Sequence, residues 1–174
     1  MNVRVMGRDE LARIRDIDRT EDVRALHRSV GGRLVKESKR IDVQQWTEAQ
    51  CASHIAWQEY ELSHGGVLLG AFEGEEFLGL AVLGNRPVGG DPKTAQLVFL
   101  HVSRAQRRKG VASALVAECV RQARMRSRKR LYISATPSES AVGFYLSKGA
   151  RLAEKPDPGL FAKEPEDIHM ILDI

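Results

Sequence analysis

The stretch from Ala95 to Ala123 combines two different apolar patterns. Residues 97–102 are almost continuously apolar, which is typical of a strand buried on both faces. From Val111 to Ala123 the apolar residues recur at helical spacing, which predicts a helix with one face in the core. The turn between these two segments is polar and cationic, and it ends at Gly110. The pattern therefore predicts a central strand, a basic turn and a helix in that order.

Shorter periodic segments, separated by turn residues, predict the remaining elements. Strands are expected at Asn2–Met6, Gly66–Phe72, Phe77–Leu83, Leu131–Ala135, Arg151–Glu154 and Asp167–Ile174. Helices are expected at Arg8–Ile17, at Gln44–Ser63 and from a cap at Ser138 to a stop at Gly149. The segments Asn85–Lys93 and 156–165, which contain five of the six prolines, are expected to be loops.

Residues 22–43 do not follow a helical pattern. Val23 and Ala25 alternate with charged residues, His27 precedes a further charge, and a second extended arm follows the pair Gly31-Gly32. Two extended arms around a Gly-Gly turn predict a β-hairpin.

Length and composition agree with one globular domain that spans residues 1–174, with 43% hydrophobic and 29% charged residues. The net charge of +4 suits an anionic ligand or nucleic acid and does not choose between them. Cys51 and Cys119 lie far apart in helical patterns, so we expect reduced thiols, and no metal-ligand spacing is present. Because no signal-like or membrane-length apolar run is found, we expect a cytoplasmic protein with no membrane partner.

The basic turn has the composition of an anion site. The first N–H groups of a helix lack internal partners and lie at its positive end. Gly110 leaves the backbone accessible, small residues follow it, and three cations precede it: Arg107, Arg108 and Lys109. The alternative is a solvated basic loop that enters an ordinary helix.

The spacing Arg107-x-x-Gly110-x-Ala112, after an apolar strand and at the start of a helix, resembles the pyrophosphate-binding motif of the GNAT superfamily of acetyltransferases. Downstream, Ala141–Ala150 resembles the A-x-x-F-Y-x-x-x-G-F signature of the same superfamily. Two positions depart from the family pattern, since Ala150 replaces an aromatic residue and Ser138 stands where an Asn is frequent. These motifs cover about the second half of the chain.

The resemblance implies an α/β fold, with a mixed, twisted sheet of about seven strands and helices on both faces. It implies acetyl-CoA as cosubstrate, with its pantetheine arm in a cleft where two parallel strands part. The implied contacts with acetyl-CoA are Leu100, Val102, Arg107, Arg108, Lys109, Gly110, Val111, Ala112, Ser113 and Ser138.

The resemblance also implies direct attack of an amine on the thioester, with Tyr145 as the acid that protonates the leaving thiolate. The alternative is a Tyr145 ring that only packs against the donor. The usual strand Glu is replaced by Gln96, whose amide cannot take a proton. His101 is the candidate base, although an unbroken strand puts it on the opposite face from Gln96 unless a bulge intervenes. A core histidine with a hydrogen bond is the alternative.

A water chain to the segment that enters the last strand is another route for the proton. Its residues Glu166, Asp167 and His169 are expected beside the acceptor. The acidic patches Asp18–Asp22 and Glu164–Asp167 favour a cationic acceptor. Relative to typical members of this family, the predicted hairpin is an insertion. It serves either acceptor binding or a subunit contact in a homodimer, and both roles stay open.

Three functions are compatible with these sequence features. The first is N-acetylation of a primary amine on a small molecule, and the second is the same chemistry on a protein N-terminus or lysine. The third is a non-catalytic CoA-binding regulatory module or a nucleic-acid-binding module that uses the basic stretch from Arg121 to Arg130. Because this stretch contains no aromatic residues, base stacking is not supported and no specific nucleic acid is expected.

Overall fold

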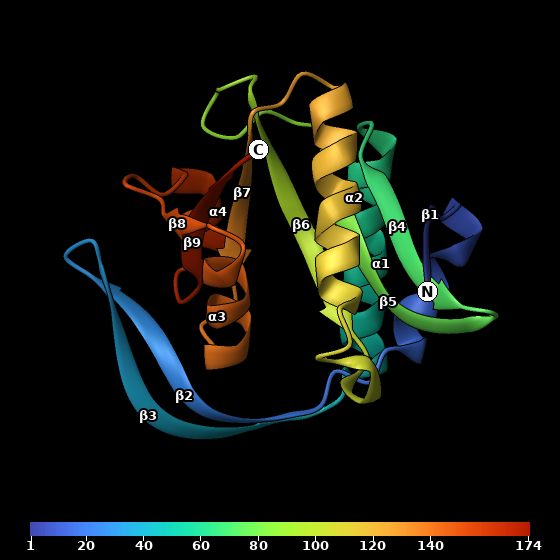
Figure 1. Cartoon of the computed structure of the whole chain (residues 1–174), viewed down its shortest axis with the longest axis horizontal. Coiled ribbons are helices and arrows are strands. Elements are labelled where there is room, and N and C mark those ends of the chain that lie inside the picture. Colours follow the sequence, from blue (N-terminus) through green and yellow to red (C-terminus); the bar gives the residue numbers. More distant parts are fainter.

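A computed structural model describes residues 1–174 and contains a seven-stranded mixed sheet (Figure 1). The strands lie in the order β1-β4-β5-β6-β7-β9-β8. Their bounds are β1 Asn2–Val5, β4 Val67–Glu73, β5 Glu76–Leu83, β6 Thr94–Val102, β7 Arg130–Ala135, β9 Ile168–Asp173 and β8 Arg151–Leu152. Only β6 and β7 run parallel, and every other neighbouring pair is antiparallel. The expected fold class, a mixed sheet of seven strands with helices on both faces, is confirmed.

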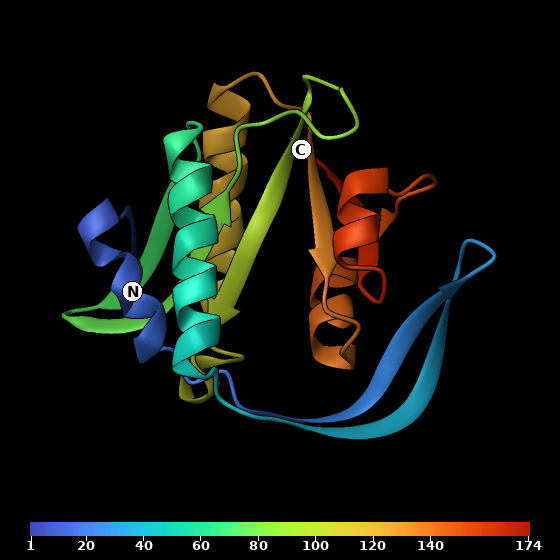
Figure 2. The same cartoon turned by 180° about the vertical axis from the view of Figure 1, so that it is seen from behind.

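The helices cover both faces of this sheet, as the two opposite views show (Figures 1 and 2). One face carries α2 (Val111–Met125) and α3 (Glu139–Ser147). The other carries the 3-10 helix η1 (Arg8–Asp16), α1 (Glu48–Ser63) and α4 (Pro158–Lys163). A short 3-10 turn, η2 (Arg104–Gln106), lies between β6 and α2. No helix is long and apolar enough to cross a membrane.

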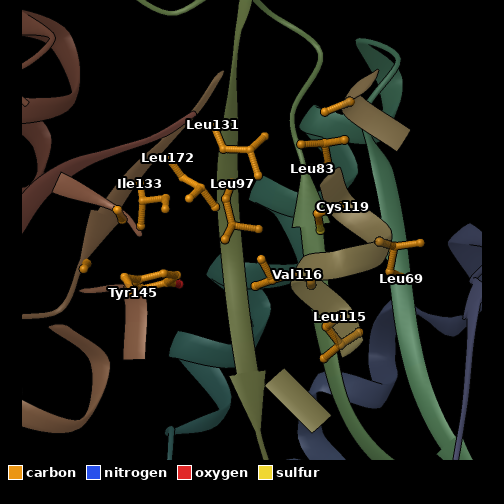
Figure 3. Close-up of a cluster of buried hydrophobic side chains, with 14 of the residues drawn as sticks. Leu69, Leu83, Leu97, Leu115, Val116, Cys119, Leu131, Ile133, Tyr145 and Leu172 are labelled. Carbon is orange, nitrogen blue, oxygen red and sulfur yellow. The ribbon is translucent and has the colours of Figure 1, made fainter. Parts of the chain in front are cut away.

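Two apolar clusters hold these layers together, one on each face of the sheet. The larger has 23 buried residues and joins α2 and α3 to the sheet through side chains such as Leu115, Leu97 and Tyr145 (Figure 3). The smaller has 13 buried residues and joins η1 and α1 to the opposite face. Burial of one large apolar side chain contributes roughly 1.5–3 kcal/mol, so both faces are fixed by packing.

The parallel strands part at their carboxyl ends. The ladder between β6 and β7 runs only from Thr94 opposite Arg130 to Leu97 opposite Ile133. Beyond Leu97 the edge of β6 has no strand partner on the β7 side. Such a gap at the carboxyl ends of parallel strands is a common ligand site in open sheets.

A β-bulge lies at the point where the strands begin to part. Leu97 is opposite Leu83 and Phe99 is opposite Val82, so Val98 is an extra residue in β6. An extra residue shifts the alternation of side chains by one. Gln96 and His101 therefore lie on the same face, the one covered by α1.

The predicted hairpin is confirmed as β2 (Glu21–Val30) and β3 (Arg33–Val43), which form a separate two-stranded sheet. It crosses the open end of the splayed strands and reaches α3 (Figure 1). The His27 N–H donates to the carbonyl of Pro137 at 2.7 Å, and Leu26 forms a β-bridge with Ser138. A 2.5 Å ion pair between Lys36 and Glu139 adds a side-chain link to α3.

Four elements differ from the sequence predictions in their bounds or type. Helix α1 begins at Glu48 rather than Gln44, because Thr47 caps it and accepts from the Gln50 N–H at 3.3 Å. The segment at 156–165 is not only loop, since it contains α4. Asp157 caps α4 by accepting from the Leu160 N–H at 2.9 Å, and proline suits the first helical turn that follows. The first helix is a 3-10 helix, and strand β8 is shorter than expected.

Candidate active site

The basic turn between β6 and α2 presents a row of free backbone donors. The first hydrogen bond of the helix joins the Ala114 N–H to the Gly110 carbonyl at 3.0 Å, and no protein partner is found for the N–H groups of residues 108–113. Gly110 has φ of 86°, and a Cβ built there meets no atom within 4 Å. The turn is therefore an open concavity lined by N–H dipoles, which fits an anionic group such as a diphosphate.

The side chain of Arg107 is already occupied, which corrects the prediction that its charge faces a diphosphate. Its guanidinium donates to the carbonyls of Val102 (3.2 Å), Thr20 (3.3 Å) and Arg19 (3.0 Å) and pairs with Glu21 at 3.1 Å. The contacts with Arg19, Thr20 and Glu21 tie the turn to the chain that leads into the hairpin, and the contact with Val102 ties it to the end of β6. Arg107 is thus a structural residue, and the turn contributes through its backbone.

Two of the three predicted cations remain available at the turn. Arg108 is exposed and has no ion-pair partner, and Lys109 is exposed with one hydrogen bond, to Gln106 at 3.0 Å. A hollow of about 370 Å³ joins this turn to the start of α3 and the base of the hairpin. It is lined by Glu21, Asp22, Val23, Arg24, Arg108, Glu139 and Ser140.

The open edge of β6 offers further backbone groups. The Ser103 N–H donates to the Leu78 carbonyl of β5 at 3.0 Å. Along a strand, the N–H groups of successive residues point to opposite sides. The N–H groups of Val102 and Leu100 therefore face the opposite side, into the gap next to β7. An extended polar chain can add to such an edge as an extra strand does.

Tyr145 lies on α3 with 7% of its surface exposed, and its ring extends from α3 toward Leu97 and Val116 (Figure 3). Burial raises the pKa of its phenol, and the nearby Cys119 and Asp167 raise that pKa further. No hydrogen bond within the protein involves its hydroxyl. A phenol with a raised pKa stays protonated and can act as a proton donor.

Ser138 is the N-cap residue of α3. Its hydroxyl accepts from the Ala141 N–H at 3.3 Å and lies 3.1 Å from the Ser140 hydroxyl, so it caps the helix as predicted. The hairpin covers its backbone through the bridge with Leu26. Any contact between Ser138 and a ligand shares the hydroxyl with this cap.

His101 has the wrong acidity for the predicted role of base. It packs against Trp46 and Phe99, with ring centroids 4.8 and 4.5 Å away. Burial, and to a lesser extent the positive charge of Arg19, lowers the pKa of His101 to about 3. An imidazole with this pKa cannot retain the proton of an amine near neutral pH, so the structure argues against His101 as the base.

The three predicted acceptor residues near the last strand lie in different surroundings. Glu166 is exposed, and Asp167 is half-buried with its pKa raised to about 6 by burial and by Glu164. His169 is buried, and both ring nitrogens are engaged, one with the Tyr132 hydroxyl at 2.8 Å and the other with the Glu164 carbonyl at 3.2 Å. His169 therefore holds the α4 segment against the sheet, which corrects its predicted contact with the acceptor.

A pocket of about 230 Å³ lies on the α1 face, between α1 and α4. It is lined by Glu61, Gly84, Arg86, Pro87, Val88, Gln96, Asp157, Gly159 and Leu160. The Glu61 side chain is only 2% exposed and pairs with Arg86 at 2.8 Å. The sequence analysis did not identify Glu61, because a glutamate inside a helical segment is almost always a surface residue.

Comparisons with known proteins agree with this geometry. The Acetyltransferase (GNAT) family model matches residues 33–150. Nourseothricin acetyltransferase is similar in structure over 99% of this chain and 97% of its own, with 15% identity and a TM-score of 0.73. A ribosomal-protein-alanine N-acetyltransferase from Brucella melitensis, at 16% identity, has a TM-score of 0.63 over 100% of both chains.

A third similar structure is the PaiA N-acetyltransferase from Thermoplasma acidophilum in complex with coenzyme A, with 14% identity and a TM-score of 0.63 over 100% of both chains. No protein of curated function matches the sequence. At these identities the structural matches establish the fold, while the family model covers more than half of the chain. The chain belongs to the GNAT family of acetyltransferases.

Proposed function

We propose that the protein transfers the acetyl group of acetyl-CoA to a primary amine on a small molecule. The observation that carries this proposal is the row of free N–H groups at residues 108–113, at the mouth of the gap between β6 and β7. The cleft thus combines an anion site with an open strand edge and a buried phenol. These are the parts that binding of acetyl-CoA and transfer from a thioester require.

Different residues of the cleft bind acetyl-CoA and act in catalysis. Acetyl-CoA supplies an activated acetyl group as a thioester. The turn at 108–113 binds its diphosphate through N–H donors, and Arg108 and Lys109 add positive charge. The edge of β6 at Leu100 and Val102 holds the pantetheine arm, and the Leu100 N–H stabilises negative charge on the reacting carbonyl oxygen. The Tyr145 hydroxyl donates a proton to the departing sulfur.

The amine must lose a proton before it attacks, because an alkylammonium of pKa about 10.4 has no free lone pair. On β6 itself, Gln96 carries no proton-accepting group and His101 has too low a pKa. The base therefore comes from another element. Asp167 is one candidate, since its pKa of about 6 allows it to accept a proton near neutral pH through a water.

A small acceptor is favoured over a protein by the dimensions of the acceptor face. The pocket between α1 and α4 has about 230 Å³, less than the ~300–1,000 Å³ that is usual for drug-sized ligands. The hairpin also crosses the end at which β6 and β7 part (Figure 2). Location in the cytoplasm and a homodimer formed through the hairpin stay predictions.

The test combines binding with turnover. Calorimetric titration with acetyl-CoA should show one site, and thiol release should depend on an added small amine. Peptides with a free N-terminus or a lysine form the competing panel. Faster turnover on peptides would replace the small-molecule assignment, and binding without turnover on either panel would favour a regulatory CoA-binding module.

A further inference from the structure

Two polar side chains are buried on one face of α1, where apolar residues are expected. Glu61 has a side chain only 2% exposed, and Gln58 is 0% exposed. The Nε2 and Oε1 atoms of Gln58 have no hydrogen-bond partner in the protein. Residues three apart on a helix lie on the same side, so both polar groups belong to one buried region. Buried polar atoms of this kind require a partner, either water or a ligand.

The pocket lined by Glu61 adjoins the reactive end of the cleft. Gln96 of β6 also lines this pocket, and the ladder between β6 and β7 ends one residue later, at Leu97. The anion-binding turn leads into α2, on the other face of the sheet (Figure 1). An acceptor in the pocket therefore meets the donor at the point where the strands part, and it approaches from the α1 face.

The charges of the pocket favour a cation. Asp157 uses both carboxylate oxygens within the protein, one for the Leu160 N–H at 2.9 Å and one for the Gly89 N–H at 3.0 Å. Arg86 donates to Oε1 of Glu61 at 2.8 Å, and no hydrogen bond reaches Oε2. With two carboxylates and one guanidinium, the lining carries a net charge of about −1 at neutral pH. The free oxygen of Glu61 is thus the open acceptor for an ammonium N–H.

We propose that Glu61 binds the ammonium group of a compact aliphatic amine that has no carboxylate, and that it takes the proton which Gln96 cannot accept. This inference rests on the proposed acetyltransferase function. The proton passes from the ammonium to the Glu61 carboxylate, and the freed nitrogen lone pair forms the C–N bond to the acetyl carbon. The C–S bond then breaks, the sulfur takes a proton from Tyr145, and Tyr145 regains one from the attacking nitrogen. One proton is released to solvent for each acetamide formed.

The decisive variant is Glu61→Gln, with n-butylamine as the acceptor probe. Because Arg86 is half-exposed, water can replace the lost ion pair, and we expect the variant to fold. We expect kcat/KM for n-butylamine to fall about 10²- to 10⁴-fold, the range of general base catalysis, with the affinity for acetyl-CoA unchanged. The matched control is Glu59→Gln, which removes an exposed carboxylate of α1 and should leave kcat/KM unchanged.

The possible outcomes distinguish failure of the role of Glu61 from failure of the proposed acetyltransferase function. A wild-type protein that binds acetyl-CoA but acetylates no amine would defeat the proposed function. An active wild type with a fully active Glu61→Gln variant would overturn only the role of Glu61. If the Gln variant fails to bind acetyl-CoA, Glu61→Ala is measured instead, and full activity of that variant with n-butylamine would contradict the proposal. A preference for 4-aminobutanoate over n-butylamine would overturn the predicted class of acceptor.

Discussion

At the scale of single side chains, Tyr145 is the residue to which the proposed function assigns proton donation to the leaving thiolate. Burial, Cys119 and Asp167 all raise the pKa of its phenol, so the hydroxyl stays protonated near neutral pH. The hydroxyl has no partner within the protein. It is therefore free to serve a departing thiolate, and the loss of its proton must be brief and coupled to transfer.

Tyr145→Phe keeps the ring and its packing and removes only the hydroxyl. If this group protonates the sulfur, turnover should fall by roughly ten- to a thousandfold, while the affinity for acetyl-CoA changes little. Steady-state kinetics and calorimetry check the two quantities. The exposed Tyr60→Phe change on α1 is the control, and equal losses of rate and affinity in Tyr145→Phe would identify a binding residue instead.

His101 should affect stability rather than the rate profile. The unfolded chain takes up a proton near the ordinary pKa of 6.5, whereas the folded protein keeps His101 neutral down to about 3. The unfolded state therefore binds more protons in this window, and stability should decrease as the pH falls from about 6.5 toward 3, by at most ~1.4 kcal/mol per pH unit from this group. Urea unfolding of wild type and His101→Phe should show a flatter acid slope in the variant, and parallel slopes would refute this account.

Among the secondary-structure elements, the turn before α2 connects sequence and function most directly. Its glycine adopts φ of 86° and opens onto empty space, so the backbone can approach a phosphate closely. The proposed phosphate site uses backbone N–H groups rather than cationic side chains. The site is therefore unaffected by the engagement of the Arg107 guanidinium within the protein.

Gly110→Asp puts a carboxylate next to the free N–H groups. Repulsion and blocked access should weaken the binding of acetyl-CoA by at least about tenfold, equivalent to ~1.4 kcal/mol. Gly74→Asp is a matched control, because Gly74 also has a positive φ (58°) and open space and lies in the β4–β5 turn. Titration calorimetry compares the two, and equal affinities would show that the diphosphate binds elsewhere.

Elements with strong local signals could be predicted from the sequence, and those set by tertiary contacts could not. The Gly31-Gly32 pair was enough to predict the hairpin, and Ser138 was enough to predict the start of α3. Helix α4 was missed because Pro158 and Gly159 are typical of loops, although proline also suits the first turn of a helix. The bulge at Val98 has no local signal, because the pairing of β6 with β5 creates it.

The site residues also divide into those with a local sequence signal and those defined by tertiary contacts. The motif identified Tyr145 and the turn, since both depend on a short segment of chain. The occupation of Arg107 and the burial of Glu61 depend on partners far away in sequence, such as Glu21 and Arg86. No periodicity within one segment carries that information.

At the scale of the whole molecule, two halves of the sheet are joined by a ladder of four residue pairs between β6 and β7. The base of the hairpin spans the open end of this junction (Figure 1). Glu21 pairs with Arg107, next to α2, at 3.1 Å and accepts from the Ser140 hydroxyl in α3 at 2.5 Å. One carboxylate thereby links both sides of the cleft.

Glu21→Gln should loosen this link without unfolding the protein. Both partners of the ion pair are only about a quarter exposed, with 28% for Arg107 and 27% for Glu21, and a pair of this kind contributes up to about 1 kcal/mol. Exchange of amide hydrogens in β2 and at the start of α3 should therefore accelerate by up to about fivefold, with the β4–β5 ladder unchanged. Glu37→Gln, which removes an exposed pair with Arg28 inside the hairpin, is the control. If exchange in α3 does not differ between the two variants, Glu21 does not stabilise the link between the hairpin and α3.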